Sequence, residues 1–347
     1  MPYFQTMAPI MKNSYFFSLV RSVLFVTISI GVLFSAYHFA PAAENPGASP
    51  INAALNIDLK IAYIKNHSNL AVLNLKDGSE IIFNEKFSEI KAVSLNSNKD
   101  KAIIAGKLKN DNGIYLADIN SKKIVPLFEK KAVYFNSPSF SDDGKSLAYT
   151  ASGKDNPFFP ADIMIYDIEK KSEKNITNQK TSAGTGIYYN YPKFSADRKS
   201  IICSAANIPD FETPRYDTIF IVKINLSGNA QAETLAGGAT SYNENGDASG
   251  FKASVPTVFN DGRIGFLKLV GIECVLAVLD PLKNKDITDL AANINNLAMP
   301  SFSKDGKYAA FEIFNDDEKN PSSSINLIEF STKSVKKIAD NGYKPAF

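Results

Sequence analysis

The sequence has little cysteine and histidine and no tryptophan. Among 347 residues there are two cysteines and two histidines. Cys203 and Cys274 fall in different copies of a repeat described below, and Cys203 occupies an apolar strand position. This placement favours two free thiols, although an oxidising compartment would allow a disulfide. No Cys/His spacing resembles a zinc site, so we predict neither a metal nor a cofactor.

The sequence also lacks a clear excess of charge of either sign. Lys and Arg total 38 and Asp and Glu total 36. Removal of the first 42 residues takes away Lys12 and Arg21 but no acidic residue, which leaves 36 against 36. A neutral domain without a basic run does not suit nucleic acid, because phosphates must be neutralised by clustered Lys and Arg. Arginine is scarce too, which disfavours a site that grips a ligand carboxylate with several arginines.

Motifs of nucleophilic catalysis are also absent. The sequence contains no Gly-x-Ser-x-Gly elbow. His38 lies in an apolar leader, and His67, between Asn66 and Ser68, is typical of a turn. A glycosidase would need two carboxylates about 5 to 9.5 Å apart, a distance that sequence does not reveal. Enzymatic activity is therefore the alternative rather than the main prediction.

The first residues form a separate module. Lys12 and Arg21 precede an apolar stretch over residues 22–39, and small residues follow at 40–42. This pattern is that of an export signal, and its length is near the roughly 18–20 residues that span a bilayer. Residues 1–42 are predicted to be either a cleaved signal peptide or a retained inner-membrane anchor with a cytoplasmic N-terminus. Both place the rest of the chain outside the cytoplasm, in the periplasm or secreted. Residues 43–56 are predicted to be a linker.

One short pattern recurs through the remaining chain. Full copies of Pro-x-Phe-Ser-x-Asp-(Gly/Arg)-Lys begin at Pro138, Pro192 and Pro300, and a shortened copy begins at Pro256. Self-similarity at a period of roughly 40–50 residues indicates a propeller or a solenoid. Each copy reads as a first strand, a tight turn at Asp-Gly, and further strands. Four antiparallel strands per repeat are the blade of a propeller.

A weaker copy and a copy split between the two ends of the chain bring the number of repeats to six. A weaker copy starts near Val93, and residues 59–63 match only a second strand. The chain ends with residues 344–347, a first strand with nothing after it. We therefore expect the last residues to supply the inner strand of the N-terminal blade and to close the ring, which removes an exposed sheet edge. Residues 57–347 are predicted to form an all-β, six-bladed β-propeller of four-stranded antiparallel blades. Four phenylalanines are expected to pack between neighbouring blades: Phe140, Phe194, Phe302 and Phe347.

The repeat unit resembles that of the TolB-like β-propellers, relatives of the WD-repeat proteins. The family form usually has Trp or Phe at the third position and Pro after Ser. Here Phe stands without any Trp, and Asp142, Ala196 or Lys304 replaces that Pro. The resemblance covers roughly residues 57–347 and implies an exported propeller that binds other components of the cell envelope. Propeller lyases that resemble this repeat use a histidine-rich metal site, which one histidine cannot supply.

The repeated acids are predicted to be structural. They lie at equivalent turn positions, where Asp suits the turn geometry, and on separate blades, too far apart to share an ion. They are Asp143, Asp197, Asp261 and Asp305. The run Asp316-Asp317-Glu318 could supply oxygen ligands to Ca²⁺, but it lacks the spacing of a defined calcium loop, which favours a solvated charge run.

Long connections point to a binding surface. The segments between second and third strands are long in three blades, and two connections between blades are long as well. Both kinds emerge on one face of a propeller, and long loops on a rigid scaffold tend to carry function. Aromatic residues and Arg are common anchors of interfaces. The candidate partner-binding residues are Phe158, Phe159, Tyr188, Tyr189, Asp210, Phe211, Arg215, Tyr216, Asp316 and Asp317.

These observations predict a non-catalytic exported propeller that binds a protein or glycan partner in the cell envelope. The membrane is a further partner if the N-terminal segment is retained, and nucleic acid is not expected. The alternative function is that of a propeller hydrolase or lyase acting on an extracellular or envelope polysaccharide.

Overall fold

The described part of the chain is all β, as predicted. In this computed structural model it comprises residues 54–109, 111–131, 133–152, 161–179, 186–208, 218–227, 231–243, 248–292, 294–315 and 322–347. Strands and turns make up these residues, and none of them forms a helix that could cross a membrane. The predicted leader 1–42 and residues 43–53 of the predicted linker lie outside the described residues.

The strands of the described residues fall into four positions and a separate hairpin. The first strands are β4 (Phe87–Leu95), β8 (Tyr134–Phe140), β12 (Gly186–Phe194), β18 (Lys252–Val258), β22 (Leu297–Phe302) and β26 (Gly342–Ala346). The second strands are β1 (Lys60–Lys65), β5 (Lys101–Leu108), β9 (Ser146–Ser152), β13 (Ser200–Ile208), β19 (Ile264–Val270) and β23 (Tyr308–Asn315). The third strands are β2 (Asn69–Asn74), β6 (Asp111–Asp118), β10 (Ala161–Asp167), β14 (Thr218–Asn225), β20 (Glu273–Asp280) and β24 (Ser322–Glu329). The fourth strands are β3 (Glu80–Ile82), β7 (Lys123–Glu129), β11 (Ser172–Asn175), β15 (Ala232–Ala239), β21 (Asp286–Ala291) and β25 (Ser334–Asp340). The hairpin is β16 (Ser241–Tyr242) with β17 (Ala248–Ser249).

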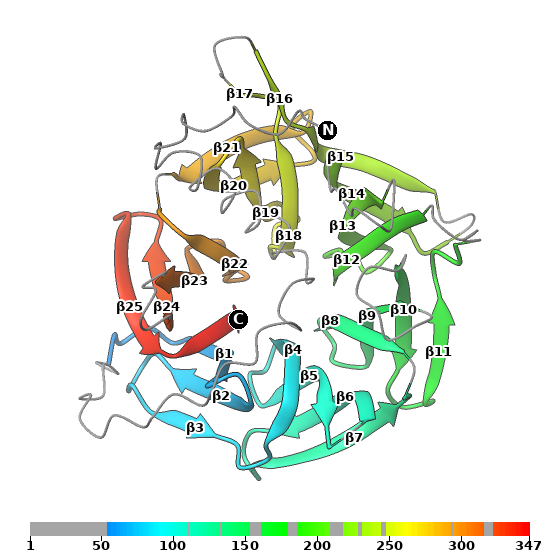
Figure 1. Cartoon of the computed structure of the whole chain (residues 1–347), viewed down its shortest axis with the longest axis vertical. Helices are drawn as coiled ribbons and strands as arrows, with labels where there is room; N and C mark the ends of the chain where they lie inside the picture. Colours follow the sequence, from blue (N-terminus) through cyan, green and yellow to red (C-terminus); the bar gives the residue numbers. More distant parts are fainter. Residues whose placement is uncertain are drawn as a thin grey trace, which may run out of the picture.

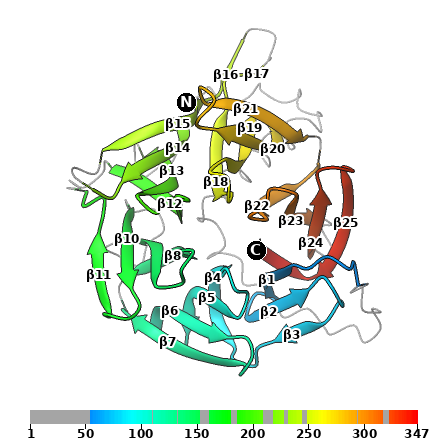
Figure 2. The ribbon, with the colours of Figure 1, turned by 180° about the vertical axis from the view of Figure 1, so that it is seen from behind.

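Antiparallel sheets surround a common centre, with the first strands innermost (Figure 1). Four of the sheets are four-stranded, and one has eight strands. The eight-stranded sheet consists of two four-stranded sets, β8–β11 and β12–β15, which join through a single parallel pairing of Ala161 with Tyr188. The view from behind shows the same arrangement (Figure 2). The prediction of four antiparallel strands per repeat is therefore confirmed.

The two ends of the described chain meet in one sheet. The last strand, β26, pairs antiparallel with β1, so that the strand order is β26-β1-β2-β3. Ala62 faces Ala346, and Ile64 faces Tyr343, on either side of a β-bulge. The amide of Phe347 also donates a hydrogen bond to Ser301 Oγ on β22, at 3.2 Å.

Apolar clusters lie between neighbouring sheets, and the repeated phenylalanines belong to them. Phe302 packs with Phe259 of the preceding sheet, with ring centroids 5.9 Å apart, and with Phe330 of its own sheet. The cluster of Phe140 and the cluster against which Phe347 packs likewise join residues of two neighbouring sheets. The cluster of Phe194 joins the two four-stranded sets of the eight-stranded sheet. Burying a side chain of this size stabilises the fold by roughly 1.5–3 kcal/mol, so these contacts hold the sheets to one another.

The repeated Asp-Gly residues form tight turns, as predicted. In the copy at Pro300, Ser303 Oγ donates a hydrogen bond to Asp305 Oδ1 at 2.6 Å and accepts one from the amide of Tyr308 at 3.0 Å. Gly306 has a φ of 70°, which glycine adopts without steric cost. The same hydroxyl–carboxylate contact is present at Ser141 and at Ser195. These acids are held by the turns themselves.

The turns define two ends of the molecule. The turns from first to second strands, such as residues 141–145 and 303–307, lie at what we call the short-turn end. Because neighbouring strands are antiparallel, second strands run away from this end, and the third strands return. The pairing of Ser152 with Ala161 therefore marks the opposite end, which we call the long-connection end.

Candidate functional site

The first strands converge on a cavity at the short-turn end. Its volume is about 510 Å³, within the range of about 300–1,000 Å³ typical of small-molecule sites. The walls come from the last residues of the first strands and from the turns that follow them.

One position of the repeat lines this cavity in copy after copy. It is the variable residue between Pro and Phe in Pro-x-Phe-Ser, and its equivalent in β4. The residues at this position are Ser94, Ser139, Lys193, Thr257 and Ser301. The fixed positions build the scaffold, and the variable position gives the cavity its chemistry.

Three lysines from three different sheets line the cavity: Lys99 after β4, Lys193 on β12, and Lys304 after β22. Burial, together with the positive charges of Lys304 and Lys99, lowers the pKa of Lys193 to about 8. Burial and the charge of Lys304 lower the pKa of Lys99 to about 8 as well. Each ammonium group thus lies within electrostatic reach of another.

The carboxylates of the cavity do not neutralise Lys99 or Lys193. Asp142 Oδ1 forms an ion pair with Lys304 Nζ, at 2.8 Å. Asp305 is engaged in its own turn with Ser303. Among the described residues, no carboxylate oxygen lies within 4.0 Å of the ammonium nitrogen of Lys99 or Lys193. Two positively charged residues therefore line the cavity without an acidic partner among the residues that the structure describes.

The residue before each repeat proline has an unusual backbone conformation. Its φ is positive although it is not glycine, which is a strained conformation that the surrounding structure must hold. The residues, with φ of 48–53°, are Ser137, Tyr191, Val255, Met299 and Lys344. Each lies at a β-bulge of a first strand. The hydroxyl of Tyr191 approaches Met299 Sδ to 3.6 Å although their strands are not neighbours, so side chains from these bulges meet near the centre.

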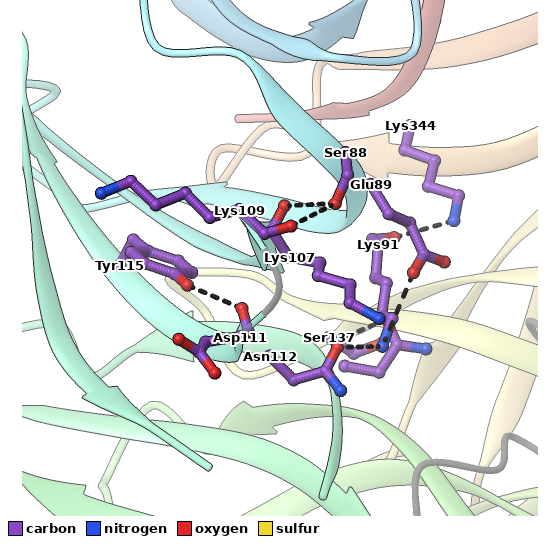
Figure 3. A network of polar contacts seen from close by, with 11 residues as sticks. Ser88, Glu89, Lys91, Lys107, Lys109, Asp111, Asn112, Tyr115, Ser137 and Lys344 are labelled. Atoms are coloured by element: carbon purple, nitrogen blue, oxygen red, sulfur yellow. Dashed lines mark hydrogen bonds and ion pairs between the residues drawn. The ribbon is translucent and has the colours of Figure 1, made fainter. Parts of the chain in front are cut away.

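A buried polar network joins two of the first strands (Figure 3). Lys91 Nζ on β4 donates to Asn112 Oδ1 at 3.2 Å and lies 4.0 Å from the centroid of the Tyr134 ring. Lys344 Nζ on β26 donates to the main-chain oxygen of Lys91 at 2.7 Å. Glu312 Oε2 accepts the amide of Lys344 at 3.3 Å. Burial raises the pKa of Glu312 to about 7 and lowers the pKa of Lys344.

Two of the predicted partner-binding residues lie within the described chain, and both are buried. Tyr188 is 1% exposed and packs with Ala161, and Tyr189 is 6% exposed in the cluster that contains Phe194. Their side chains contribute to packing rather than to an exposed surface. The other candidates lie outside the described residues: Phe158, Phe159, Asp210, Phe211, Arg215, Tyr216, Asp316 and Asp317.

An exposed apolar pair lies at the long-connection end. Tyr242, on the hairpin that projects from the sheets in Figure 1, is 56% exposed. Its hydroxyl oxygen is 3.6 Å from the position that a Cβ would take on Gly271, in the turn between β19 and β20. The next residue, Ile272, is 48% exposed. The two apolar side chains therefore come from neighbouring segments at this end of the molecule.

Both cysteines are free, as the sequence favoured. Cys203 is buried and Cys274 is half-buried. Burial raises the pKa of both thiols, that of Cys274 to about 11, which keeps them protonated at neutral pH. Within the described ranges, no three His, Cys, Asp or Glu side chains are grouped so as to hold a metal ion. His67 lies in the turn between β1 and β2, as predicted.

Comparison with solved structures identifies the fold. TolB from Acinetobacter baumannii superposes with a TM-score of 0.61 at 17% identity, covering 83% of this chain and 66% of that one. A protein assigned as TolB from Agrobacterium tumefaciens gives 0.55 at 12% identity, with 81% and 87% covered. One chain of a nidogen/laminin complex gives 0.54 at 10% identity, with 83% and 97% covered. This chain thus spans just under two thirds of the first TolB. The fold is that of the TolB-like propellers, and similarity at these identities shows the fold alone.

No family model and no curated protein matches the sequence.

Proposed function

We propose that this chain is a non-catalytic, exported β-propeller that binds a protein or glycan partner in the cell envelope. The proposed binding surface is the long-connection end. The observation that carries the proposal is the exposed pair of Tyr242 and Ile272 at that end.

Single exposed apolar residues are common on protein surfaces, whereas adjacent ones are typical of interaction sites. The other large exposed apolar residues of the described chain, such as Leu282 and Val335, lie in turns or on fourth strands at separate places. Tyrosine is also among the residues that anchor protein interfaces. Similarity to one chain of a nidogen/laminin complex is consistent with a protein partner.

The candidate residues of the long connections belong to the same proposal. Segments 153–160 and 209–217, with Phe158, Phe159 and Tyr216, connect second strands to third strands. Those strands end and begin at the long-connection end. The proposed surface therefore combines the hairpin with these segments.

We further propose that the sheets form a six-bladed propeller closed by the C-terminal strand. The pairing of β26 with β1 supports closure, and the six strands at each of the four positions support the count. Export rests on the leader at residues 1–42, which we propose to be a cleaved signal or an inner-membrane anchor.

The alternative function, a polysaccharide hydrolase or lyase, has less support. A glycosidase mechanism needs two available carboxylates. The two carboxylates that line the cavity, Asp142 and Asp305, are already engaged by Lys304 and by the turn.

The binding surface can be tested by cross-linked pull-down from an envelope extract, quantified by mass spectrometry, with a glycan array for carbohydrate partners. The variants are Tyr242→Ala with Ile272→Ser, and Phe158→Ala with Phe159→Ala and Tyr216→Ala. The control is Val335→Ser, because Val335 is exposed on the fourth strand β25. We expect one set of partners to be lost from both variants and kept by the control. Identical partner sets from all proteins would overturn the proposed surface.

A further inference from the structure

We propose that the cavity at the short-turn end is a second binding site, specific for small molecules that carry at least two negative charges on phosphate or carboxylate groups. The site is formed by Lys99, Lys193 and Lys304. It lies at the end opposite to the surface of the proposed function and does not depend on it.

Positively charged residues outnumber acidic ones in the lining of the cavity. Three lysines line it with two aspartates, and one of the aspartates, Asp142, pairs with Lys304. Lys99 and Lys193 face the same space without an acidic partner in the described chain. Like charges at short range in a partly buried site repel one another, and a counter-charge between them offsets this repulsion. A bound dianion would remove this repulsion.

The three lysines come from three different sheets, so the fold alone brings them together. Water screens the repulsion between fully solvated lysines, so that it costs little free energy. Burial removes part of the hydration of Lys193 and Lys99, and their repulsion is therefore stronger. A cluster of this kind costs stability, which a ligand can restore.

The remaining wall is partly polar and partly apolar, because it includes the neutral residues Thr257 and Asn260 as well as Phe194 and Phe302. Lysine is a compact point charge that does not require the planar geometry which arginine selects. Phosphate and carboxylate groups are both suited to it, and neutral sugars are not.

The volume sets the size of the ligand. A cavity of about 510 Å³ admits a small organic anion together with some water. It does not fit a folded partner, which distinguishes this site from the surface at the long-connection end.

The test is isothermal titration calorimetry of the full chain at physiological salt, with inorganic pyrophosphate and citrate as separate probes. We expect Lys99→Gln with Lys193→Gln to weaken binding of at least one probe by about tenfold or more, since two charge interactions are lost. The control is Lys199→Gln, an exposed lysine of the turn after β12 that lies outside the cavity. It should leave affinity within about twofold. Tight binding of only one probe would identify the group as phosphate or carboxylate.

The pH dependence gives a second readout. The charged groups that face the cavity are Lys99, Lys193, Lys304, Asp142 and Asp305. Because the pKa values of Lys99 and Lys193 are about 8, affinity for citrate, whose carboxyl groups are already ionised at neutral pH, should fall as pH rises from 7 to 9, and this dependence should be reduced in the double variant.

Stability separates a binding role from a structural one. If the lysines are a ligand site, the double variant should be at least as stable as the wild type, because unpaired charges are removed. Equal affinity of the wild type and the double variant, absence of binding by both probes, or a destabilised double variant would each overturn the proposal.

Discussion

Glu312 shows how burial can outweigh a nearby positive charge. Its side chain is 9% exposed and accepts one hydrogen bond, from the amide of Lys344. The loss of hydration favours the neutral carboxyl group more strongly than the charge of Lys344 favours the carboxylate, and the pKa rises from 4.5 to about 7. The protonation of one residue beside the last strand is therefore linked to folding.

We predict that the free energy of unfolding falls between pH 4.5 and pH 7 because of Glu312. A pKa that is higher in the folded state stabilises the protein below the unfolded pKa, and this stability is lost as pH rises through the folded pKa. The contribution is at most about 3 kcal/mol. Urea denaturation at several pH values should show that Glu312→Gln matches the wild type near pH 4 and is the more stable protein at pH 8. A variant with an unchanged pH slope would contradict the assignment.

At the scale of elements, the turn after the first strand depends on one hydroxyl group in the three full copies of the repeat. Ser303 is buried and holds both the carboxylate of Asp305 and the amide of Tyr308. The shortened copy has Phe259 in the position of this serine. There Asp261 accepts the amide of Arg263, as Asp305 accepts the amide of Lys307, and the side chain of Arg263 takes the place of the serine hydroxyl as its donor. The repeat thus tolerates two solutions for one turn.

We predict that Ser303→Ala lowers the free energy of unfolding by roughly 1–2 kcal/mol, because two hydrogen bonds are lost and the amide of Tyr308 is left unsatisfied. Chemical denaturation measures the difference. Ser331→Ala is the matched control, since Ser331 is an exposed turn residue, and it should change stability by less than about 0.5 kcal/mol. Equal effects of the two changes would mean that the hydroxyl of Ser303 does not hold the turn.

For the whole molecule, the last strand connects three sheets. β26 pairs with β1, the amide of Phe347 reaches β22, and Lys344 Nζ reaches the backbone of β4. The contacts are with both neighbours of the N-terminal sheet. If the propeller is closed as we propose, its stability depends on these few residues.

We predict that deletion of residues 343–347 lowers the melting temperature and makes the protein prone to aggregate, because β1 becomes an exposed sheet edge. Differential scanning calorimetry and light scattering measure the two effects. A peptide of residues 340–347 supplied in excess should restore part of the lost stability. An unchanged melting temperature after deletion would rule out closure by this strand.

The local elements were predictable because their causes are local. The Asp-Gly turn, the strands around it and the turn position of His67 each depend on residues within a few positions of one another. The complementary ends, a second strand without a first at residues 59–63 and a first strand without a second at 344–347, also predicted the pairing of β1 with β26. Each of these local signals is weak by itself, and they could be recognised because they recur along the chain.

The candidate site was less predictable. Sequence pointed to the long connections, where Tyr188 and Tyr189 proved to be buried and the other candidates lie outside the described residues. The cavity at the short-turn end was not predicted. Its one sequence signal is the variable position of Pro-x-Phe-Ser, which lines the cavity in the copies before the last one.

By itself, then, the sequence determined the repeat, its turns and the all-β class, since these depend on backbone preferences and on strand periodicity. Only the tertiary structure decided which side chains share a space. Lys99, Lys193 and Lys304 are far apart in the chain, and their charges meet only because the sheets carry them to a common centre. Local preferences hold no information on such long-range proximity, and it is this proximity that produces the charged cavity.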